Sequence, residues 1–186
     1  MQIKRYANWG GAMGCLVVLQ FVFPIVAEAN GDKDCPRAES VGTDGVPIEF
    51  GQYQFADGGS DLVLSRQTGN GTDIKRVTYG GGKSEGCLHN SVALAVGGGE
   101  DQWGWHLAWA GNQGLFYARM DGEAWVSSPP KRLTTTAASE IKLQVHGPKL
   151  LLRWHEQNGD EVEVYQAVSQ NEGRNWEPPQ SFHPAN

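Results

Sequence analysis

The chain has 186 residues, 25 of them glycine, and a formal net charge of −6 at pH 7. Lysine and arginine are scattered along it, so no basic stripe offsets the acidic balance, and nucleic acid and anionic membrane surfaces are excluded as expected partners. No apolar stripe has the period of about 3.6 residues that marks a helix, so an all-β chain is predicted.

Residues 1–29 have the features of a signal peptide. Lys4 and Arg5 form a positive start, an almost uncharged apolar run covers residues 15–27, and Ala27-Glu-Ala29 offers a cleavage site. A membrane anchor is the alternative, but a run of about 13 residues is shorter than the roughly 20 that span a bilayer. We therefore expect a secreted or periplasmic protein that is not bound to a membrane after cleavage.

Residues 30–45 are polar and rich in turn formers, which predicts an N-terminal arm before a domain at 46–186. Cys35 and Cys87 remain after cleavage, and an even count in an exported protein favours a disulfide. Closing a loop of about 50 residues would stabilise the fold by roughly 3–4 kcal/mol. Cys87 with His89 could instead form half of a metal site, but no second ligand pair lies nearby, so neither a metal nor another cofactor is expected.

The domain begins with a divergent first unit at residues 46–88. Strands are predicted at residues 61–65 and 75–79, on either side of the turn-forming segment Thr68–Thr72. The same segment carries Asn70-Gly-Thr72, a glycosylation sequon at the predicted hairpin tip.

Two further units, at 90–133 and 139–183, are copies of one degenerate repeat of about 49 residues. The strands predicted in them are 92–96, 105–109, 115–119 and an edge strand from 131 in the first unit, and 141–145, 150–154, 161–168 and 180–182 in the second. The landmarks that coincide are Trp109 with Trp154, Tyr117 with Tyr165, Gly122 with Gly173, and Trp125 with Trp176. A period of this length with several short strands is typical of β-propeller blades.

Side chains alternate between two faces along the second strand of each unit. Trp109 and Trp154 fall on matching faces and are predicted to pack between sheets. The opposite face carries His106 in one unit, and Arg153 and His155 in the other.

The last unit ends in Ser169-x-Asn171-x-Gly173-x-x-Trp176, which suits a hairpin tip. Asn171 can accept hydrogen bonds from N–H groups of the turn, Gly173 can adopt positive φ, and Trp176 can pack on the neighbouring sheet. The motif resembles the Asp-box of the sialidase-like, or BNR-repeat, β-propellers, with asparagine in place of the acid. The resemblance covers residues 90–182 and implies a structural turn on the outer rim, away from any active site.

A sialidase-type glycoside hydrolase is the enzyme that this resemblance implies. Sialidases bind the substrate carboxylate with three arginines, and use a Tyr–Glu nucleophilic pair and an aspartic acid, spread over six blades. The matching candidates are Arg153, Arg66 and Arg119 for the anion, Tyr165 with Glu163 for the nucleophilic pair, and Asp57 or Asp61 for the acid. The chain has room for about three blades. No motif of another enzyme class is present, so a non-catalytic role is the leading hypothesis.

Recognition of a glycan or of an exported protein is the function that we expect. Trp103 and Trp105 lie in a glycine-rich stretch, and aromatic rings presented from such loops pack on sugars or on protein partners. His106, Arg153 and His155 complete the expected ligand-binding set. The alternative is that Trp105 begins a strand and is buried. A structural or inhibitory role toward another exported protein is a third hypothesis.

Three blades do not readily close a wheel, because propellers typically have at least four. An open arc exposes sheet edges that invite pairing. Two hypotheses follow: the chain forms a homo-oligomer that completes a ring, or its N-terminal portion supplies a blade and the ends close on one another. The predicted fold is thus all-β, with about three antiparallel propeller-type blades.

Overall fold

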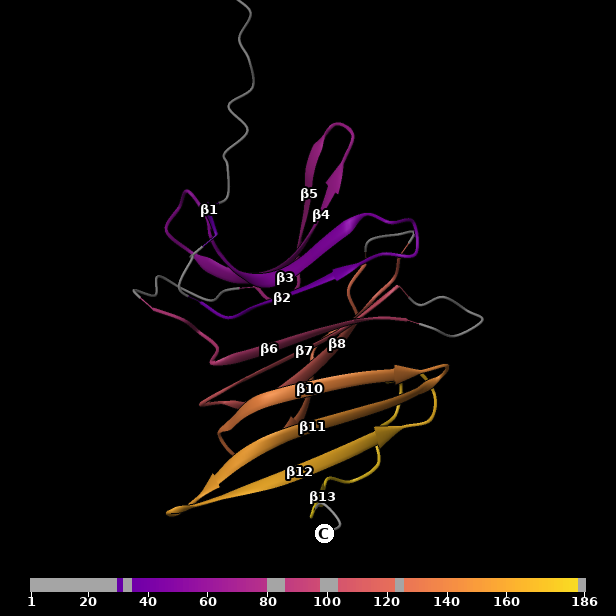
Figure 1. The fold of residues 1–186 in the computed structure, drawn as a ribbon. Coiled ribbons are helices and arrows are strands. Elements are labelled where there is room, and N and C mark those ends of the chain that lie inside the picture. The colour runs from indigo at the N-terminus through magenta and orange to yellow at the C-terminus, as the bar shows by residue number, and fades with distance from the viewer. Residues whose placement is uncertain (1–29, 32–34, 80–85, 98–103, 123–125, 184–186) are drawn as a thin grey trace, which may run out of the picture.

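The computed structural model describes residues 30–31, 35–79, 86–97, 104–122 and 126–183, and all regular structure within them is β-strand. The strands form three antiparallel sheets, called A, B and C in chain order, and sheet B lies between the other two (Figure 1). The predicted all-β fold of blade-like antiparallel sheets is confirmed. The predicted signal peptide and Trp125 lie outside the described residues.

Sheet A contains β1 (Asn30–Gly31), β2 (Arg37–Val41), β3 (Pro47–Gln54), β4 (Ser60–Thr68) and β5 (Gly71–Arg76). β1 and β2 follow one another along the same edge of β3, so the sheet is four strands wide. The segment 30–45 thus differs from the expected arm, because part of it pairs with β3 and forms the edge of the sheet. Thr68 pairs with Gly71 across a tight turn, so β5 begins earlier than the strand predicted at 75–79.

Sheet B contains β6 (Ser91–Val96), β7 (Trp105–Gly111), β8 (Gly114–Met120) and β9 (Lys131–Thr134). Sheet C contains β10 (Ala138–His146), β11 (Lys149–Asn158), β12 (Glu161–Ser169) and β13 (Gln180–Ser181). In both sheets consecutive strands are neighbours, so each sheet is an antiparallel meander of four strands. Each strand predicted in the two repeat units coincides with one of these eight strands.

The strand register corrects one of the paired landmarks. Trp109 pairs with Phe116 across β7 and β8, and Trp154 pairs with Tyr165 across β11 and β12. The counterpart of Tyr165 is therefore Phe116, and the predicted match with Tyr117 is displaced by one residue. A shift of one residue moves a side chain to the other face of a sheet. The two ring pairs have similar geometry, with centroids 5.7 Å apart for Trp109–Phe116 and 6.1 Å apart for Trp154–Tyr165.

Two apolar cores hold the sheets together, one on each side of sheet B. Between sheets A and B, the Phe50 and Trp109 rings meet edge-on with centroids 6.1 Å apart. Between sheets B and C, Trp154 belongs to one cluster with Ala108 and Ala110. Trp109 is 3% exposed and Trp154 0% exposed, which confirms both as residues of the cores between sheets. Each indole faces the preceding sheet, and small side chains on sheet B leave room for Trp154.

The Ser169–Trp176 turn folds as its sequence predicts. Asn171 Oδ1 accepts a hydrogen bond from the Asn175 N–H at 2.8 Å. Ser169 Oγ accepts one from the Gly173 N–H at 2.8 Å, and Gly173 has a φ of 76°. These bonds satisfy backbone donors that the end of β12 leaves without a strand partner.

Tyr117 of sheet B is the residue on which this turn packs. The Trp176 ring meets the Tyr117 ring nearly at right angles, with centroids 4.9 Å apart. The Tyr117 hydroxyl donates to the Glu172 carbonyl at 3.3 Å, and a Cβ at Gly173 would collide with the Tyr117 ring. The turn therefore fastens sheet C to sheet B.

Candidate functional site

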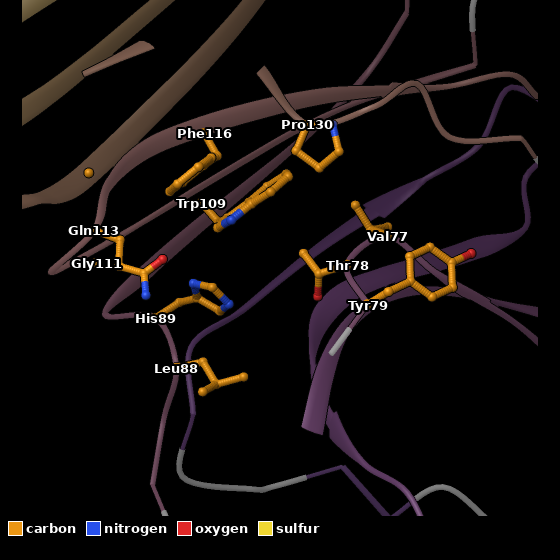
Figure 2. A pocket seen from close by; sticks show the side chains of 11 residues that line it. Val77, Thr78, Tyr79, Leu88, His89, Trp109, Gly111, Gln113, Phe116 and Pro130 are labelled. Carbon is orange, nitrogen blue, oxygen red and sulfur yellow. The ribbon is translucent and has the colours of Figure 1, made fainter. Parts of the chain in front are cut away.

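A pocket of about 560 Å³ opens between sheets A and B (Figure 2). Its walls come from segments far apart in sequence: the residues after β5, the residues before β6, the β7–β8 hairpin and the residue before β9. The lining residues are Val77, Thr78, Tyr79, Leu88, His89, Trp109, Gly111, Gln113, Gly114, Phe116 and Pro130. None of them is an acid, a lysine or an arginine.

One wall of the pocket is a stack of aromatic rings. The β7–β8 register places Trp109 opposite Phe116, and their ring planes are only 10° from parallel. The His89 ring meets the Trp109 ring edge-on with centroids 6.4 Å apart, and the Arg132 guanidinium lies 5.3 Å from the Phe116 ring centre. Trp109 also belongs to the core, whereas Phe116 is half-buried, so Phe116 offers the more accessible ring.

The polar groups of the pocket are uncharged. Burial lowers the pKa of His89 to about 4, so its imidazole is neutral at physiological pH. Gln113 is exposed in the turn between β7 and β8, and its amide can both donate and accept hydrogen bonds. Tyr79 is 75% exposed, and the Thr78 hydroxyl accepts a hydrogen bond from the Leu62 N–H at 2.9 Å. Apolar walls with a few neutral polar groups are typical of small-molecule sites.

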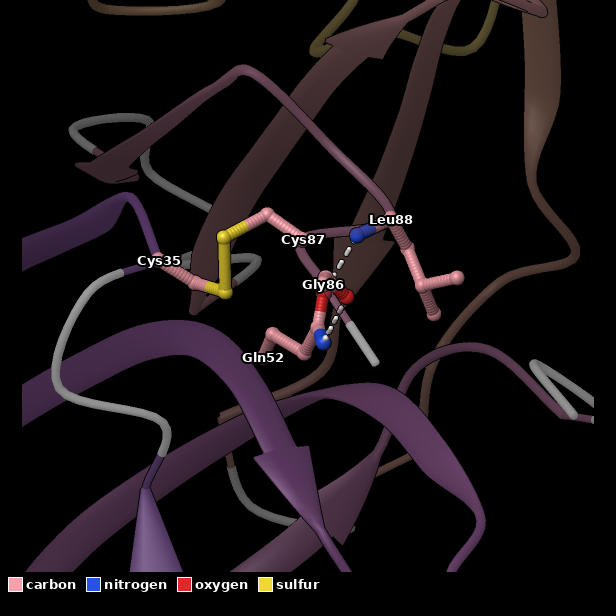
Figure 3. Close-up of a disulfide and its surroundings, with 5 residues drawn as sticks. All are labelled: Cys35, Gln52, Gly86, Cys87 and Leu88. Carbon is pink, nitrogen blue, oxygen red and sulfur yellow. Dashed lines mark hydrogen bonds between the residues drawn. A yellow bond between two sulfur atoms is a disulfide. The ribbon is translucent and has the colours of Figure 1, made fainter. Parts of the chain in front are cut away.

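The segment that precedes β6 is anchored to sheet A by a disulfide (Figure 3). The predicted bond between Cys35 and Cys87 is formed, with Cα atoms 5.3 Å apart. Beside it, the Gln52 side chain accepts a hydrogen bond from the Leu88 N–H at 2.7 Å and donates one to the Gly86 carbonyl at 3.2 Å. A covalent bond and a pair of hydrogen bonds thus hold the residues that lead into the pocket.

The disulfide also decides between the two interpretations of Cys87. A sulfur in a disulfide is not available as a thiolate ligand, so Cys87 and His89 do not form half of a metal site in this state. Among the residues that the structure describes, no group of three or more His, Cys, Asp or Glu side chains could hold a metal ion. Within the same residues, no helix has the length and apolar character needed to cross a membrane.

The tryptophans that we expected to present to a ligand do not line this pocket. Trp103 lies outside the described residues. Trp105 begins β7 and is 6% exposed, so it cannot serve as an exposed platform, and the alternative of a buried strand residue holds instead. The reason is the position of β7: sheets A and C cover its two faces, and the strand is buried along its whole length.

His106 is also buried, on the face of β7 that points toward sheet C. Its Nδ1 lies 2.7 Å from the Tyr117 hydroxyl, whose proton is directed to the Glu172 carbonyl, so Nδ1 is the donor in this pair. Burial, assisted by the Arg119 charge, lowers the pKa of His106 to about 4, and burial raises the pKa of Tyr117. These groups form a neutral polar contact between sheets B and C.

Arg153 and His155 lie on the face of sheet C that points away from sheet B. Arg153 Nε donates to Gln166 Oε1 at 3.4 Å, and its guanidinium carbon lies 4.0 Å from the Phe182 ring centre. His155 Nδ1 is 3.4 Å from a Glu140 carboxylate oxygen. The two residues share a face with each other, but sheet B separates them from the pocket.

The candidate catalytic trio is divided between two faces of sheet C. The Tyr165 hydroxyl donates to Glu163 Oε2 at 2.7 Å, and this hydrogen bond is the main cause of the raised pKa of Tyr165. Both side chains share the face of Trp154, which points toward sheet B. Arg153 precedes Trp154 in β11 and therefore points the other way. It cannot bind the carboxylate of a substrate placed at the Tyr–Glu pair.

The pocket was missed in the sequence because no motif joins its walls. Phe116 reads as one more residue of a strand, and in the sequence His89 stands out only beside Cys87. One local signal was available: Gly111 and Gly114 flank a two-residue turn, which marks Gln113 as exposed at the end of a strand that carries an aromatic residue.

Comparisons with known proteins identify no family. No family model matches the chain, and neither a curated protein nor a solved structure matches it. The interpretation of the pocket therefore depends on its own geometry and chemistry.

Proposed function

We propose that the chain is an exported, non-catalytic recognition module that binds a neutral glycan in the pocket between sheets A and B. The observation that carries the proposal is the uncharged, aromatic lining of this pocket. A sugar ring has apolar C–H groups that pack on aromatic rings and hydroxyl groups that need neutral donors and acceptors. Phe116 and Tyr79 supply rings, and His89 and Gln113 supply neutral polar groups.

We extend the proposal to the origin of the fold and to export. The four-stranded antiparallel sheets and the hydrogen bonds of the Ser169–Trp176 turn support a relationship to the sialidase-like propellers. The Cys35–Cys87 disulfide supports an oxidising, extracytoplasmic location, as expected for a protein with a cleaved leader.

A sialidase-type hydrolase is the alternative, and the hydrogen bond between Tyr165 and Glu163 favours it. Two observations weigh against it. Arg153 points away from this pair, and the residues that line the pocket are uncharged, with the nearby Arg132 guanidinium placed over the Phe116 ring. An exported protein that inserts an apolar side chain into the same pocket is a second binding hypothesis.

Binding to an array of neutral glycans, followed by calorimetry on any hit, tests the proposal with two matched variants. Gln113→Ala removes a polar group that lines the pocket. Asn112→Ala removes an exposed amide from the same turn, outside the pocket lining. We expect Gln113→Ala to weaken binding about tenfold, the effect of one lost hydrogen bond, and Asn112→Ala to leave affinity unchanged.

Other outcomes of these assays would reject the proposal. Silence of the wild-type protein across the array would remove glycans and leave an apolar protein segment as the ligand. Turnover of a fluorogenic sialoside would establish the hydrolase, provided that Glu163→Gln abolishes it. Equal losses in Gln113→Ala and Asn112→Ala would place the ligand outside the pocket.

A further inference from the structure

The stack of sheets has two faces that no described strand covers. We call them outer face A, the side of sheet A away from sheet B, and outer face C, the side of sheet C away from sheet B. The extensive contacts between strands of different sheets join β2 and β3 to β6, and β6 and β7 to β10. Sheets A and C lie at opposite ends of the stack, so the two outer faces of one chain do not meet (Figure 1).

Three exposed apolar side chains lie on these two faces. Phe50 of β3 faces sheet B, so the alternate register positions of sheet A face outward. By this alternation Val41 and Ile74 lie on outer face A, and Val162 lies on outer face C. They are 59%, 39% and 58% exposed, and are three of the five large hydrophobic side chains exposed among the described residues. The central positions of outer face A, Val63 and Ser65, are buried within the chain, so its exposed margins on β2 and β5 are the part of this face open to a partner.

The charges of the two faces are complementary. Lys142 and Arg153 lie directly opposite one another on adjacent strands of outer face C, and Glu39 and Glu49 do so on outer face A. Like charges in this position destabilise a sheet unless a group of opposite sign approaches them. Arg37 supplies such a group to Glu49 at 2.9 Å, and Glu39 is left as the exposed carboxylate. Lys149, the first residue of β11, is a further cation of outer face C, and Arg76 with Asp61 and His155 with Glu140 form internal pairs.

We propose that outer face A of one copy binds outer face C of a second copy. When two copies do this reciprocally about a two-fold axis, both contacts are equivalent and no outer face remains open. The product is a closed ring of six sheets made from two chains. This arrangement places the apolar residues Val41 and Val162 in the contact and sets Glu39 against the cations Lys142 and Arg153.

The outer faces are suited to a contact between separable subunits. Sheet B carries Ala108 and Ala110 where it receives the indole of sheet C, whereas sheet C carries Arg153 and His155 at the corresponding positions. Interfaces that form between independently folded subunits are more polar than a domain core, and charged rims guide them together. The dimer is therefore expected to weaken as salt concentration rises.

Sedimentation analysis of the full exported chain tests the contact with three charge variants. Val162→Glu places an acid on outer face C opposite the acidic face, and Val41→Lys places a cation on outer face A opposite the cationic face. Val126→Glu is the matched control, because Val126 is 57% exposed and lies between β8 and β9, outside both outer faces. We expect a two-chain mass for the wild type and Val126→Glu, and a dimer dissociation constant raised on the order of tenfold or more in each face variant.

Mixing the two face variants sharpens the test. A mixed pair keeps one contact between two unaltered faces, so the mixture should recover dimer that neither variant forms alone. Loss of dimer in only one face variant would indicate a contact between identical faces and overturn the proposal. A wild-type protein that stays a monomer at its highest soluble concentration would also overturn it. Circular dichroism and melting temperature establish that each variant remains folded.

Discussion

Sheets B and C have the same four-stranded antiparallel topology, yet their second strands are buried differently. All seven residues of β7 are buried, whereas in β11 buried side chains alternate with half-buried ones. Sheet B is covered on both faces, and sheet C is covered on one. Beside the tryptophan, sheet B therefore carries Ala108 where sheet C carries Arg153. Both sheets carry a tryptophan on the face toward the preceding sheet. On the opposite face, sheet B carries a small residue where sheet C packs on it, and sheet C carries a charged residue where no described strand packs.

Exchanging residues between the two sheets tests this difference in burial most directly. Ala108→Arg would bury a charge without a partner between sheets B and C, and we expect it to destabilise the fold by about 3–5 kcal/mol or prevent folding. The reciprocal change Arg153→Ala should change stability by less than about 1 kcal/mol, because it removes a surface contact with Phe182 and a long hydrogen bond to Gln166. Urea unfolding followed by tryptophan fluorescence measures both. Similar losses in the two variants would contradict the assignment of faces.

Different interactions stabilise the contacts of sheet B with sheets A and C. Removing the disulfide tests the contact with sheet A. Replacing Cys35 and Cys87 by serine should destabilise the A–B boundary by roughly 3–4 kcal/mol, because the unfolded chain regains the freedom of a loop of about 50 residues. Thiol reductant added to the wild type is the control and should give the same loss. Unchanged urea midpoints would show that the apolar core alone determines this boundary.

The boundary between sheets B and C depends on Gly173, which packs against the Tyr117 ring. Gly173→Ala forces a side chain into a φ of 76° and against the Tyr117 ring, and we expect a loss of about 2–3 kcal/mol. Gly147→Ala is the matched control, because Gly147 has a φ of 58° and open space where its Cβ would lie. The control should lose only about 1–2 kcal/mol. Equal losses in the two variants would mean that the clash with Tyr117 does not contribute to the loss of stability.

Acid should lower the free energy of unfolding by a smaller amount than these substitutions. His89 acts at the boundary between sheets A and B, and His106 at the boundary between sheets B and C. Their folded pKa of about 4 lies below the ordinary value of 6.5, so the unfolded chain takes up protons first as pH falls. Their contribution is complete above pH 6.5 and is lost between pH 6.5 and 4. The loss is about 1 kcal/mol per histidine between pH 6.5 and 5.5. His106→Gln should flatten this slope in urea titrations.

Much of the fold could be predicted because its signals are local. Alternation, turn residues and the repeat landmarks predict the strands of sheets B and C, and the Ser169–Trp176 turn depends only on neighbours in sequence. The match of Tyr117 with Tyr165 failed because Phe116 and Tyr117 are adjacent aromatics. Only their strand partners reveal which of them faces sheet A.

The candidate site could not be predicted in the same way. The expectation for Trp105 relied on glycines near it in sequence, but its exposure depends on sheets A and C, which lie far along the chain. The pocket joins the end of sheet A to a turn of sheet B, and the disulfide sets how these meet. Arg153 and His155 lie on the outer face of sheet C, away from the pocket between sheets A and B.

The disulfide ends one residue before Leu88, and this has a practical consequence for handling the protein. Dithiothreitol or phosphine in a purification buffer would sever the tie next to Leu88 and His89, leaving the Gln52 amide as their nearby attachment to sheet A. Ligand affinity measured in such a buffer is expected to be weaker than in oxidised samples and to return on air oxidation. The redox history of a preparation therefore becomes a variable to record in every binding experiment.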